Sequence, residues 1–194
     1  MPALLIIVLL DMVPEFSKSV ITPTFTMAKD LVEEIVRASL IDGVPAWAKL
    51  SPNTHLVIEG ALAAQRGGAQ AVTLINTALG MSMNPTTGLP SLGNGGGGLS
   101  GRSVHPIAVR ALYEVSANVP GLPIVGVGGV TSGWEAIELM LAGASAVQVG
   151  TATFAEPRAM SRIQREMNRW AQRRGINDWS KIVGLAHRGG LGAL

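Results

Sequence analysis

The chain of 194 residues contains no cysteine. This absence excludes disulfide bonds, thiolate metal sites, iron–sulfur ligation and a cysteine nucleophile within the chain, and it is compatible with a cytoplasmic location. Charge is also scarce, because only 14% of the residues are Asp, Glu, Lys or Arg and the formal net charge is +2. So small a positive excess gives no support to a nucleic-acid partner. The most basic stretch, residues 169–174, is interpreted as the solvated face of a helix.

A hydrophobic run long enough to span a bilayer is missing as well. The apolar run at residues 1–10 ends at Asp11, well short of the roughly 18 residues that a span requires. No basic residue precedes it and no clear cleavage site follows, so a signal peptide is not expected. We interpret residues 1–25 as an atypical apolar segment that forms a buried or edge strand, the alternative being a segment foreign to the fold. Residues 26–194 are expected to form one domain.

Short apolar runs alternate with amphipathic segments along this domain. Helices are expected at about 27–39, 52–66, 105–119, 133–142 and 157–174, and strands at 45–50, 71–75, 123–127 and 146–149. Apolar runs without internal alternation are typical of parallel strands covered on both faces. The pattern predicts an α/β fold of about four strand–helix units, either half of a barrel or a doubly wound sheet. The tryptophans and methionines are expected to pack in the core or between helices.

A long segment at residues 78–103, rich in Gly, Asn, Pro and Ser, interrupts the pattern. Its run Gly93–Gly98 is not expected to hold a regular element. Structureless loops of this length inside a compact domain are usually functional or mobile.

Two strands that end in glycine are the most informative feature. Gly128 and Gly129 follow one expected strand, and Gly150 and Thr151 follow the next. A glycine-ended strand that leads into a helix presents bare backbone N–H groups to an anion. In (β/α) barrels the loops after strands seven and eight often hold a phosphate. The two turns therefore predict a phosphate site.

Three further positions are candidates because they follow strands or lie in the long loop. Lys49 ends an apolar strand, as either an edge side chain reaching solvent or a cation aimed at an electron-rich ligand atom. Asn76 and Thr77 offer an amide and a hydroxyl, which suit a planar imide or carboxylate, although this pair is also common in turns. Gly101 either admits a ligand close to the backbone or only makes the loop flexible.

Other polar residues are not expected to do chemistry. The histidines lack metal-ligand spacing and are interpreted as surface or packing residues; they are His55, His105 and His187. The acidic residues form no convincing catalytic pair and are assigned to solvated helix faces; they include Asp30, Glu33, Glu34, Glu135 and Glu138. No metal site is expected.

Six motifs follow one another in a fixed order: KLSPN at 49–53, LINT at 74–77, GGLSG at 97–101, HPIAVR at 105–110, GVGGV at 126–130 and LAGASAVQVGT at 141–151. Together they resemble the class 1 dihydroorotate dehydrogenases, most of all the type that works with an electron-transfer partner subunit. The resemblance runs from about Val44 to Ala155, and more loosely from Thr26 to the C-terminus. The pyrimidine-reducing domain of dihydropyrimidine dehydrogenases shares much of this pattern.

The resemblance implies an FMN-binding TIM barrel that oxidises dihydroorotate to orotate in pyrimidine (UMP) biosynthesis. It also implies a cytoplasmic homo-oligomer and an iron–sulfur flavoprotein subunit as electron partner. Lys49 and Ile75 would lie beside the flavin ring, and Asn76 and Thr77 would hold the pyrimidine. The ribityl phosphate would be surrounded by Gly101, Gly128, Gly129, Gly150 and Thr151.

The chain departs from the family because it corresponds only to the second half of the barrel, roughly strands five to eight. The loop that bears the proton-abstracting Cys or Ser has no matching motif here. Four hydroxyl residues lie roughly where that loop would end, and none is assigned as the base: Ser17, Ser19, Thr22 and Thr24. Half a barrel also leaves two open sheet edges, which favour dimerisation, aggregation or docking with another half.

Three functions remain open at this point. The first is a dihydroorotate dehydrogenase in truncated form, inactive or nearly so by itself because it lacks the base. The second is a catalytically silent half barrel that binds a flavin or a phosphate. The third is a reductase of the dihydropyrimidine dehydrogenase type.

Overall fold

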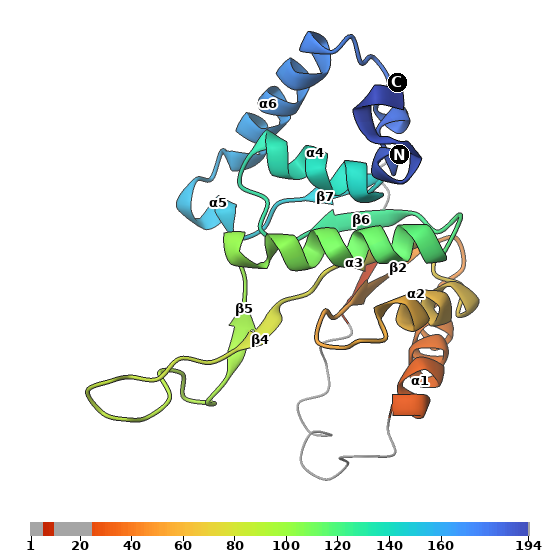
Figure 1. Ribbon diagram of the computed structural model, residues 1–194. Coiled ribbons are helices and arrows are strands. Elements are labelled where there is room, and N and C mark those ends of the chain that lie inside the picture. Colours follow the sequence, from red (N-terminus) through yellow and green to blue (C-terminus); the bar gives the residue numbers. More distant parts are fainter. Residues whose placement is uncertain (1–5, 10–24, 194) are drawn as a thin grey trace.

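A computed structural model describes residues 6–9 and 25–193 (Figure 1). Its main sheet contains five strands, all parallel, in the order β1-β2-β3-β6-β7. The bounds of these strands are β1 Ile6–Leu9, β2 Ala46–Leu50, β3 Ala71–Leu74, β6 Ile124–Val127 and β7 Ala146–Gln148. Residues 6–9 of the apolar N-terminal segment form β1, which pairs with β2 and is the first strand of the described sheet.

The order of the strands follows their order in the chain without a reversal. A doubly wound sheet reverses its order at a switch point, whereas a (β/α) barrel adds each new strand beside the previous one. The predicted parallel α/β fold is therefore confirmed, and its winding is that of a barrel. Among the described residues, β1 and β7 form the two edges of this sheet.

The long helices form one continuous layer, because α1 packs on α2, α2 on α3, α3 on α4, and α4 on α6 (Figure 1). Their bounds are α1 Phe25–Ala38, α2 Val57–Arg66, α3 His105–Asn118, α4 Gly133–Ala142 and α6 Ala159–Arg173. Shorter helical turns are η2 Arg102–Val104, α5 Ala152–Ala155, η3 Trp179–Lys181, η4 Leu185–Arg188 and η5 Gly190–Ala193. None of the described helices has both the length and the apolar character that a bilayer crossing demands.

The main core lies between this helix layer and one face of the sheet. Alternate residues of β2 and β3, including Leu50 and Leu74, belong to it together with Ile124 of β6. Because side chains alternate between the two faces of a strand, the intervening residues, such as Lys49, lie on the other face. Leu112 of α3 and Leu139 of α4 complete the core.

The long segment after β3 is not structureless, and this expectation was wrong. Its ends form an antiparallel ribbon of β4 (Ala78–Gly80) and β5 (Gly97–Leu99), so the glycine run contributes Gly97 and Gly98 to a strand. Antiparallel pairing uses backbone N–H and C=O groups, which glycine also has. The ribbon and the loop beyond it project from the body of the molecule as an arm (Figure 1).

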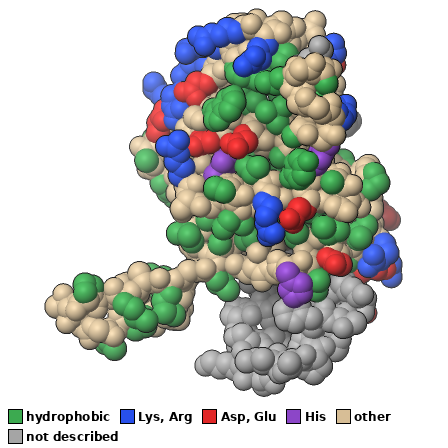
Figure 2. Space-filling view, viewed as in Figure 1, with side chains coloured by type: hydrophobic (Ala, Val, Ile, Leu, Met, Phe, Trp, Pro, Cys, Tyr) green, Lys and Arg blue, Asp and Glu red, His purple; other side chains and the backbone are tan. Residues whose placement is uncertain are grey.

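The arm, residues 78–99, contains no charged residue. Figure 2 shows green hydrophobic side chains on it and no red or blue ones. The large exposed side chains are Leu79, Met81, Met83, Leu89, Leu92 and Leu99. Met81 and Met83 therefore do not pack in a core as expected, and neither does Trp134, which is 57% exposed.

Candidate functional site

A cavity of about 380 Å³ lies where β2, β3, β6 and β7 end. The structure brings all nine predicted site residues to its wall: Lys49, Ile75, Asn76, Thr77, Gly101, Gly128, Gly129, Gly150 and Thr151. Parallel strands place their carboxyl ends at the same edge of a sheet, where barrel proteins bind their ligands. The position of these residues is thus a finding, whereas their individual roles remain predictions.

Backbone hydrogen bonds fix the residues that follow β3. The amide N–H of Ile75 donates to the carbonyl oxygen of Val127 over 2.8 Å, and that of Asn76 donates to Leu50 over 2.9 Å. The pairing of β3 therefore continues beyond Leu74, to β6 through Ile75 and to β2 through Asn76. Asn76 lies beside the end of β2. Lys49 lies on the strand face opposite to the buried Ala48 and Leu50, the face that the cavity uses.

The side-chain amide of Asn53 connects the cavity wall with the base of the arm. Its Nδ2 donates to the carbonyl oxygen of Thr77 over 3.0 Å, and its Oδ1 accepts from the N–H of Leu79 over 2.8 Å. The loop after β2 is therefore tied to both the cavity wall and the base of the arm. The sequence analysis did not assign this role to Asn53, although it lies in the KLSPN motif.

The turn after β6 requires glycine. Gly128 and Gly129 have φ values of 141° and 67°, which side chains with a Cβ rarely adopt. A Cβ at Gly129 would lie 2.7 Å from the Cβ of His105 and 2.9 Å from the carbonyl oxygen of Gly101. At Gly150, by contrast, a Cβ would meet nothing within 4 Å, so this residue borders open space.

The two glycine turns offer hydrogen-bond donors to a ligand. None of the hydrogen bonds among the described residues uses the backbone N–H of Gly129, Gly150 or Thr151. The hydroxyl of Thr151 donates to that of Ser100 over 3.0 Å, which joins the second turn to the end of the arm. Backbone N–H groups that line a cavity without a partner among the described residues suit an anion.

The charge of the cavity wall has one sign. Its described residues include two cations, Lys49 and Arg102, and no Asp or Glu. Lys49 belongs to β2, whereas the glycine turns follow β6 and β7, two and three strands away. At about 4.8 Å per strand, the two ends of the wall are roughly 10 to 14 Å apart. This arrangement suits an elongated ligand with negative charge at one end and an electron-rich group at the other.

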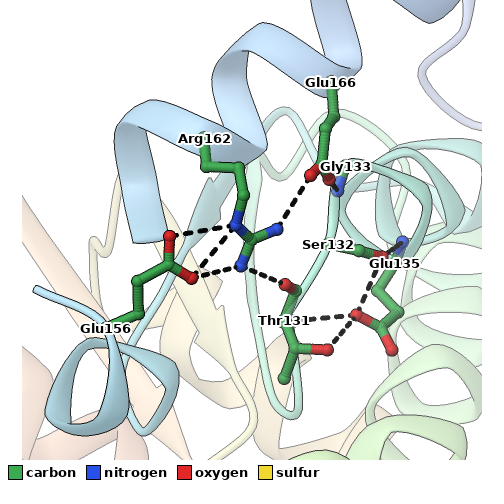
Figure 3. Close-up of polar contacts among 7 residues, drawn as sticks. All are labelled: Thr131, Ser132, Gly133, Glu135, Glu156, Arg162 and Glu166. Atoms are coloured by element: carbon green, nitrogen blue, oxygen red, sulfur yellow. Dashed lines mark hydrogen bonds and ion pairs between the residues drawn. The ribbon is translucent and has the colours of Figure 1, made fainter. Parts of the chain in front are cut away.

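A buried carboxylate supports the turn after β6 (Figure 3). Glu135 is only 5% exposed, and its Oε2 accepts from the N–H of Thr131 over 2.8 Å, from the Thr131 hydroxyl over 2.7 Å and from the Ser132 hydroxyl over 3.0 Å. Burial alone raises the pKa of Glu135, but these hydrogen bonds and the charge of Arg102 outweigh it and lower the pKa to about 2. The assignment of Glu135 to a solvated helix face was wrong.

Arg162 of α6 connects three elements behind the same turn (Figure 3). Its guanidinium donates to Glu156 at 2.7 to 3.0 Å, to Glu166 at 2.8 Å and to the carbonyl oxygen of Thr131 at 3.0 Å. Glu166 in turn accepts from the N–H of Gly133 over 2.7 Å. That N–H is the first of α4, so a carboxylate of the protein already occupies this helix start. The N–H of Gly133 is therefore already used by the protein, and the phosphate prediction, which names the strand-end glycines, is unaffected.

His105 and His187 pack against other groups and His55 is exposed, which agrees with the expectation of surface or packing residues. His105 is 7% exposed; its Nδ1 lies 2.8 Å from the carbonyl oxygen of Gly128 and its Nε2 lies 3.1 Å from Glu138. His187 stacks on Tyr113 with 4.0 Å between the ring centroids. Glu138 is engaged by His105 rather than simply solvated. Within the described part of the chain, no cluster of His, Asp and Glu has the makings of a metal site.

The catalytic base remains unassigned. The four hydroxyl residues considered from the sequence lie outside the described residues; they are Ser17, Ser19, Thr22 and Thr24. No role is given to them here.

The sequential parallel sheet, with a cavity lined by Lys49 and Arg102 at the carboxyl ends of its strands, defines an α/β protein of the (β/α)-barrel class. Comparison with known proteins then gives the family: the family model described as dihydroorotate dehydrogenase matches residues 15–170. The chain belongs to the dihydroorotate dehydrogenase family.

Individual relatives agree. The chain is 44% identical over 156 residues to the dihydroorotate dehydrogenase B (NAD(+)) catalytic subunit of Methanosarcina acetivorans. The aligned region covers 79% of this chain and 50% of the relative. It is 42% identical over 158 residues to the same subunit of Halalkalibacterium halodurans, covering 81% and 50%. It is 40% identical over 154 residues to a putative dihydroorotate dehydrogenase A (fumarate) of Solibacter usitatus, covering 79% and 50%. The chain thus spans about half the length of these relatives.

Proposed function

We propose that this chain is the FMN- and pyrimidine-binding half of a dihydroorotate dehydrogenase, an enzyme that oxidises dihydroorotate to orotate in pyrimidine biosynthesis. The observation that carries the proposal is the cavity wall, whose described residues include the nine predicted ones, Lys49 among them, together with Arg102 and no acidic residue. Family membership supports the reaction class, because the relatives are named for it.

The residues present fit FMN. The glycine turns leave room and free N–H groups for a phosphate, and we assign that phosphate to Gly101, Gly128, Gly129, Gly150 and Thr151. Lys49 and Ile75 are assigned to the neighbourhood of the flavin ring. When bound, FMN supplies the acceptor for two electrons, while the protein supplies orientation and electrostatics.

Lys49 and the Asn76–Thr77 pair then meet two different requirements of the reaction, the stabilisation of charge and the orientation of the substrate. The Lys49 ammonium favours negative charge in its vicinity, which a positive group on a low-dielectric wall stabilises. Asn76 and Thr77 present donors and acceptors that orient a planar pyrimidine. Removal of a proton from the substrate needs a base, and no described residue is assigned to it. We therefore expect this polypeptide alone to bind the ligands and to turn over slowly or not at all.

Reconstitution with FMN tests the proposal. The purified chain is mixed with FMN, separated from the excess and measured by its absorbance spectrum, with riboflavin as the phosphate-free comparison. A stable yellow complex with FMN supports the site, whereas a protein that stays colourless contradicts both the enzyme and the silent flavin module. Anaerobic mixing with dihydroorotate separates these two, because bleaching of the flavin band supports the enzyme and persistence supports the silent module.

The remaining alternative and the partners are tested in the same way. Reduction of uracil or thymine would favour the dihydropyrimidine-reducing enzyme. The relatives are named for NAD(+) or for fumarate, and we propose an iron–sulfur flavoprotein subunit as the electron partner, which turnover with fumarate alone would contradict. The cytoplasmic setting and the homo-oligomer stay predictions, the latter to be checked by light scattering.

A further inference from the structure

Arg102 is a cation of the cavity wall to which no role has yet been given. It begins η2, directly after Gly101, whose φ of 84° turns the chain at this point. Its side chain is 77% exposed, and it lines the same cavity as the two glycine turns.

The residue before Arg102 touches both of these turns. The carbonyl oxygen of Gly101 lies close to Gly129, since a Cβ placed on Gly129 would be 2.9 Å from this oxygen. On the other side, a Cβ at Gly101 would lie 3.6 Å from the Cγ2 of Thr151. The side chain of Arg102 therefore starts beside the two glycine turns that form the proposed anion site.

One donor of its guanidinium, the Nε, is bound by a carboxylate of the protein. The Nε of Arg102 donates to the Oε1 of Glu135 over 2.9 Å, whereas Oε2 of the same carboxylate is occupied by Thr131 and Ser132. A guanidinium carries five N–H donors, and no other hydrogen bond of Arg102 occurs among the described residues. The planar group is thus oriented by a buried carboxylate and keeps donors for a second anion.

This arrangement differs from an ordinary surface ion pair. Exposed pairs contribute little to stability, and three further hydrogen bonds to Glu135 come from Thr131 and Ser132. An arginine whose orientation is fixed beside free backbone donors is instead typical of recognition of a phosphate, which the guanidinium binds in a bidentate manner.

We propose that Arg102 is a specificity-determining residue that binds the phosphate dianion held at Gly129, Gly150 and Thr151, with Glu135 as the residue that positions its guanidinium. The inference rests on the proposed function, because it takes the phosphate to be that of FMN. It gives the site a means to discriminate a phosphorylated flavin from an unphosphorylated one.

Flavin titrations of Arg102→Gln and Arg102→Lys test this inference, with FMN and riboflavin as parallel ligands and quenching of flavin fluorescence as the signal. Arg110→Gln is the matched control, because Arg110 is an exposed arginine of α3 that pairs with Glu114 and does not line the cavity. We expect Arg102→Gln to raise the Kd for FMN about 10- to 100-fold, and to leave the Kd for riboflavin within about twofold. Arg102→Lys should lie between, since it keeps the charge and loses the planar fork.

Three results would overturn the inference. They are wild-type affinity of Arg102→Gln for FMN, an equal loss of both flavins, or an equal effect of Arg110→Gln. If the wild-type chain binds neither flavin, the proposed function fails, and titration with inorganic phosphate followed by amide NMR decides the inference. Phosphate shifts at Gly129 and Gly150 that vanish in Arg102→Gln support it, and their absence in the wild type contradicts it.

Discussion

The Nδ1 of His105 donates a hydrogen bond to the carbonyl oxygen of Gly128 across 2.8 Å. A carbonyl oxygen only accepts, so the proton of this bond belongs to the ring. The first residue of α3 thereby fixes the conformation of the glycine turn after β6.

Replacing this histidine should destabilise the fold. His105→Ala removes a buried donor and is expected to lower the free energy of unfolding by about 1 to 3 kcal/mol. His105→Asn places an amide nitrogen near the Nδ1 position and should recover part of the loss. Urea denaturation measures both variants, and equal destabilisation by Ala and Asn would contradict a role for the donor.

Two glycines of the cavity wall should respond differently to alanine. Gly129→Ala meets backbone and His105 atoms at 2.7 to 3.0 Å in a left-handed conformation, so we expect a loss of at least about 1 kcal/mol of stability. Gly150→Ala meets no atom within 4 Å and should keep wild-type stability. Its added methyl group should nevertheless weaken FMN, which thermal unfolding and flavin titration together reveal. Destabilisation by Gly150→Ala, or unchanged FMN affinity, would contradict this assignment.

Glu135 should make stability depend on pH in the acid range. Its pKa is about 2 in the folded chain and 4.5 without the fold, so its contribution is complete above pH 4.5 and is lost as the pH falls toward 2. The difference corresponds to about 3 kcal/mol. Glu135→Gln should therefore lower the free energy of unfolding at pH 7 and flatten its change between pH 4.5 and 2. Parallel curves for both proteins in urea melts would contradict this.

Arg162 should not be replaceable by lysine. A single ammonium group cannot contact Glu156, Glu166 and the Thr131 carbonyl as the planar fork does, so Arg162→Lys is expected to cost about 1 to 2 kcal/mol. Arg165→Ala is the control, because Arg165 is an exposed neighbour on the same helix and should change stability by less than about 0.5 kcal/mol. Equal stability of the two variants would show that the contacts of Arg162 are dispensable.

Lys49→Ala should impair flavin reduction more than phosphate anchoring. We expect FMN affinity to stay within a few-fold of wild type, because the glycine turns are two or more strands away. Reduction of bound FMN by dihydroorotate, followed by stopped-flow absorbance, should slow about 100-fold if one electrostatic contact is lost. Equal reduction rates at saturating FMN would rule out this role.

The sequence predicts which residues line the cavity because strand ends are local signals. Lys49, Asn76 and Gly128 each follow a short apolar run, and parallel pairing then brings such ends to one edge without further information. The bounds of the helix Gly133–Ala142 are also set by local residues, since Ser132 caps its start and Gly143 turns the chain after it.

What the sequence could not predict depends on partners distant along the chain. Glu135 has the spacing of a solvent-facing residue, and its contact with Arg102, 33 residues away along the chain, gives no sign in that spacing. Gly97 and Gly98 join a strand because Leu79 and Gly80 lie opposite them. The pair of Arg162 and Glu166 follows from their spacing on one helix, whereas the contacts of Arg162 with Glu156 and the Thr131 carbonyl oxygen involve other segments of the fold.

The amide of Asn53 makes the uncharged arm and the rim of the cavity into a single mechanical unit. Its nitrogen donates to the carbonyl oxygen of Thr77 and its oxygen accepts from the N–H of Leu79, so we expect a displacement of the cavity wall at Thr77 to shift the base of the arm. A spectroscopic probe attached at Met83, remote from the chemistry, should accordingly sense whether the cavity is filled.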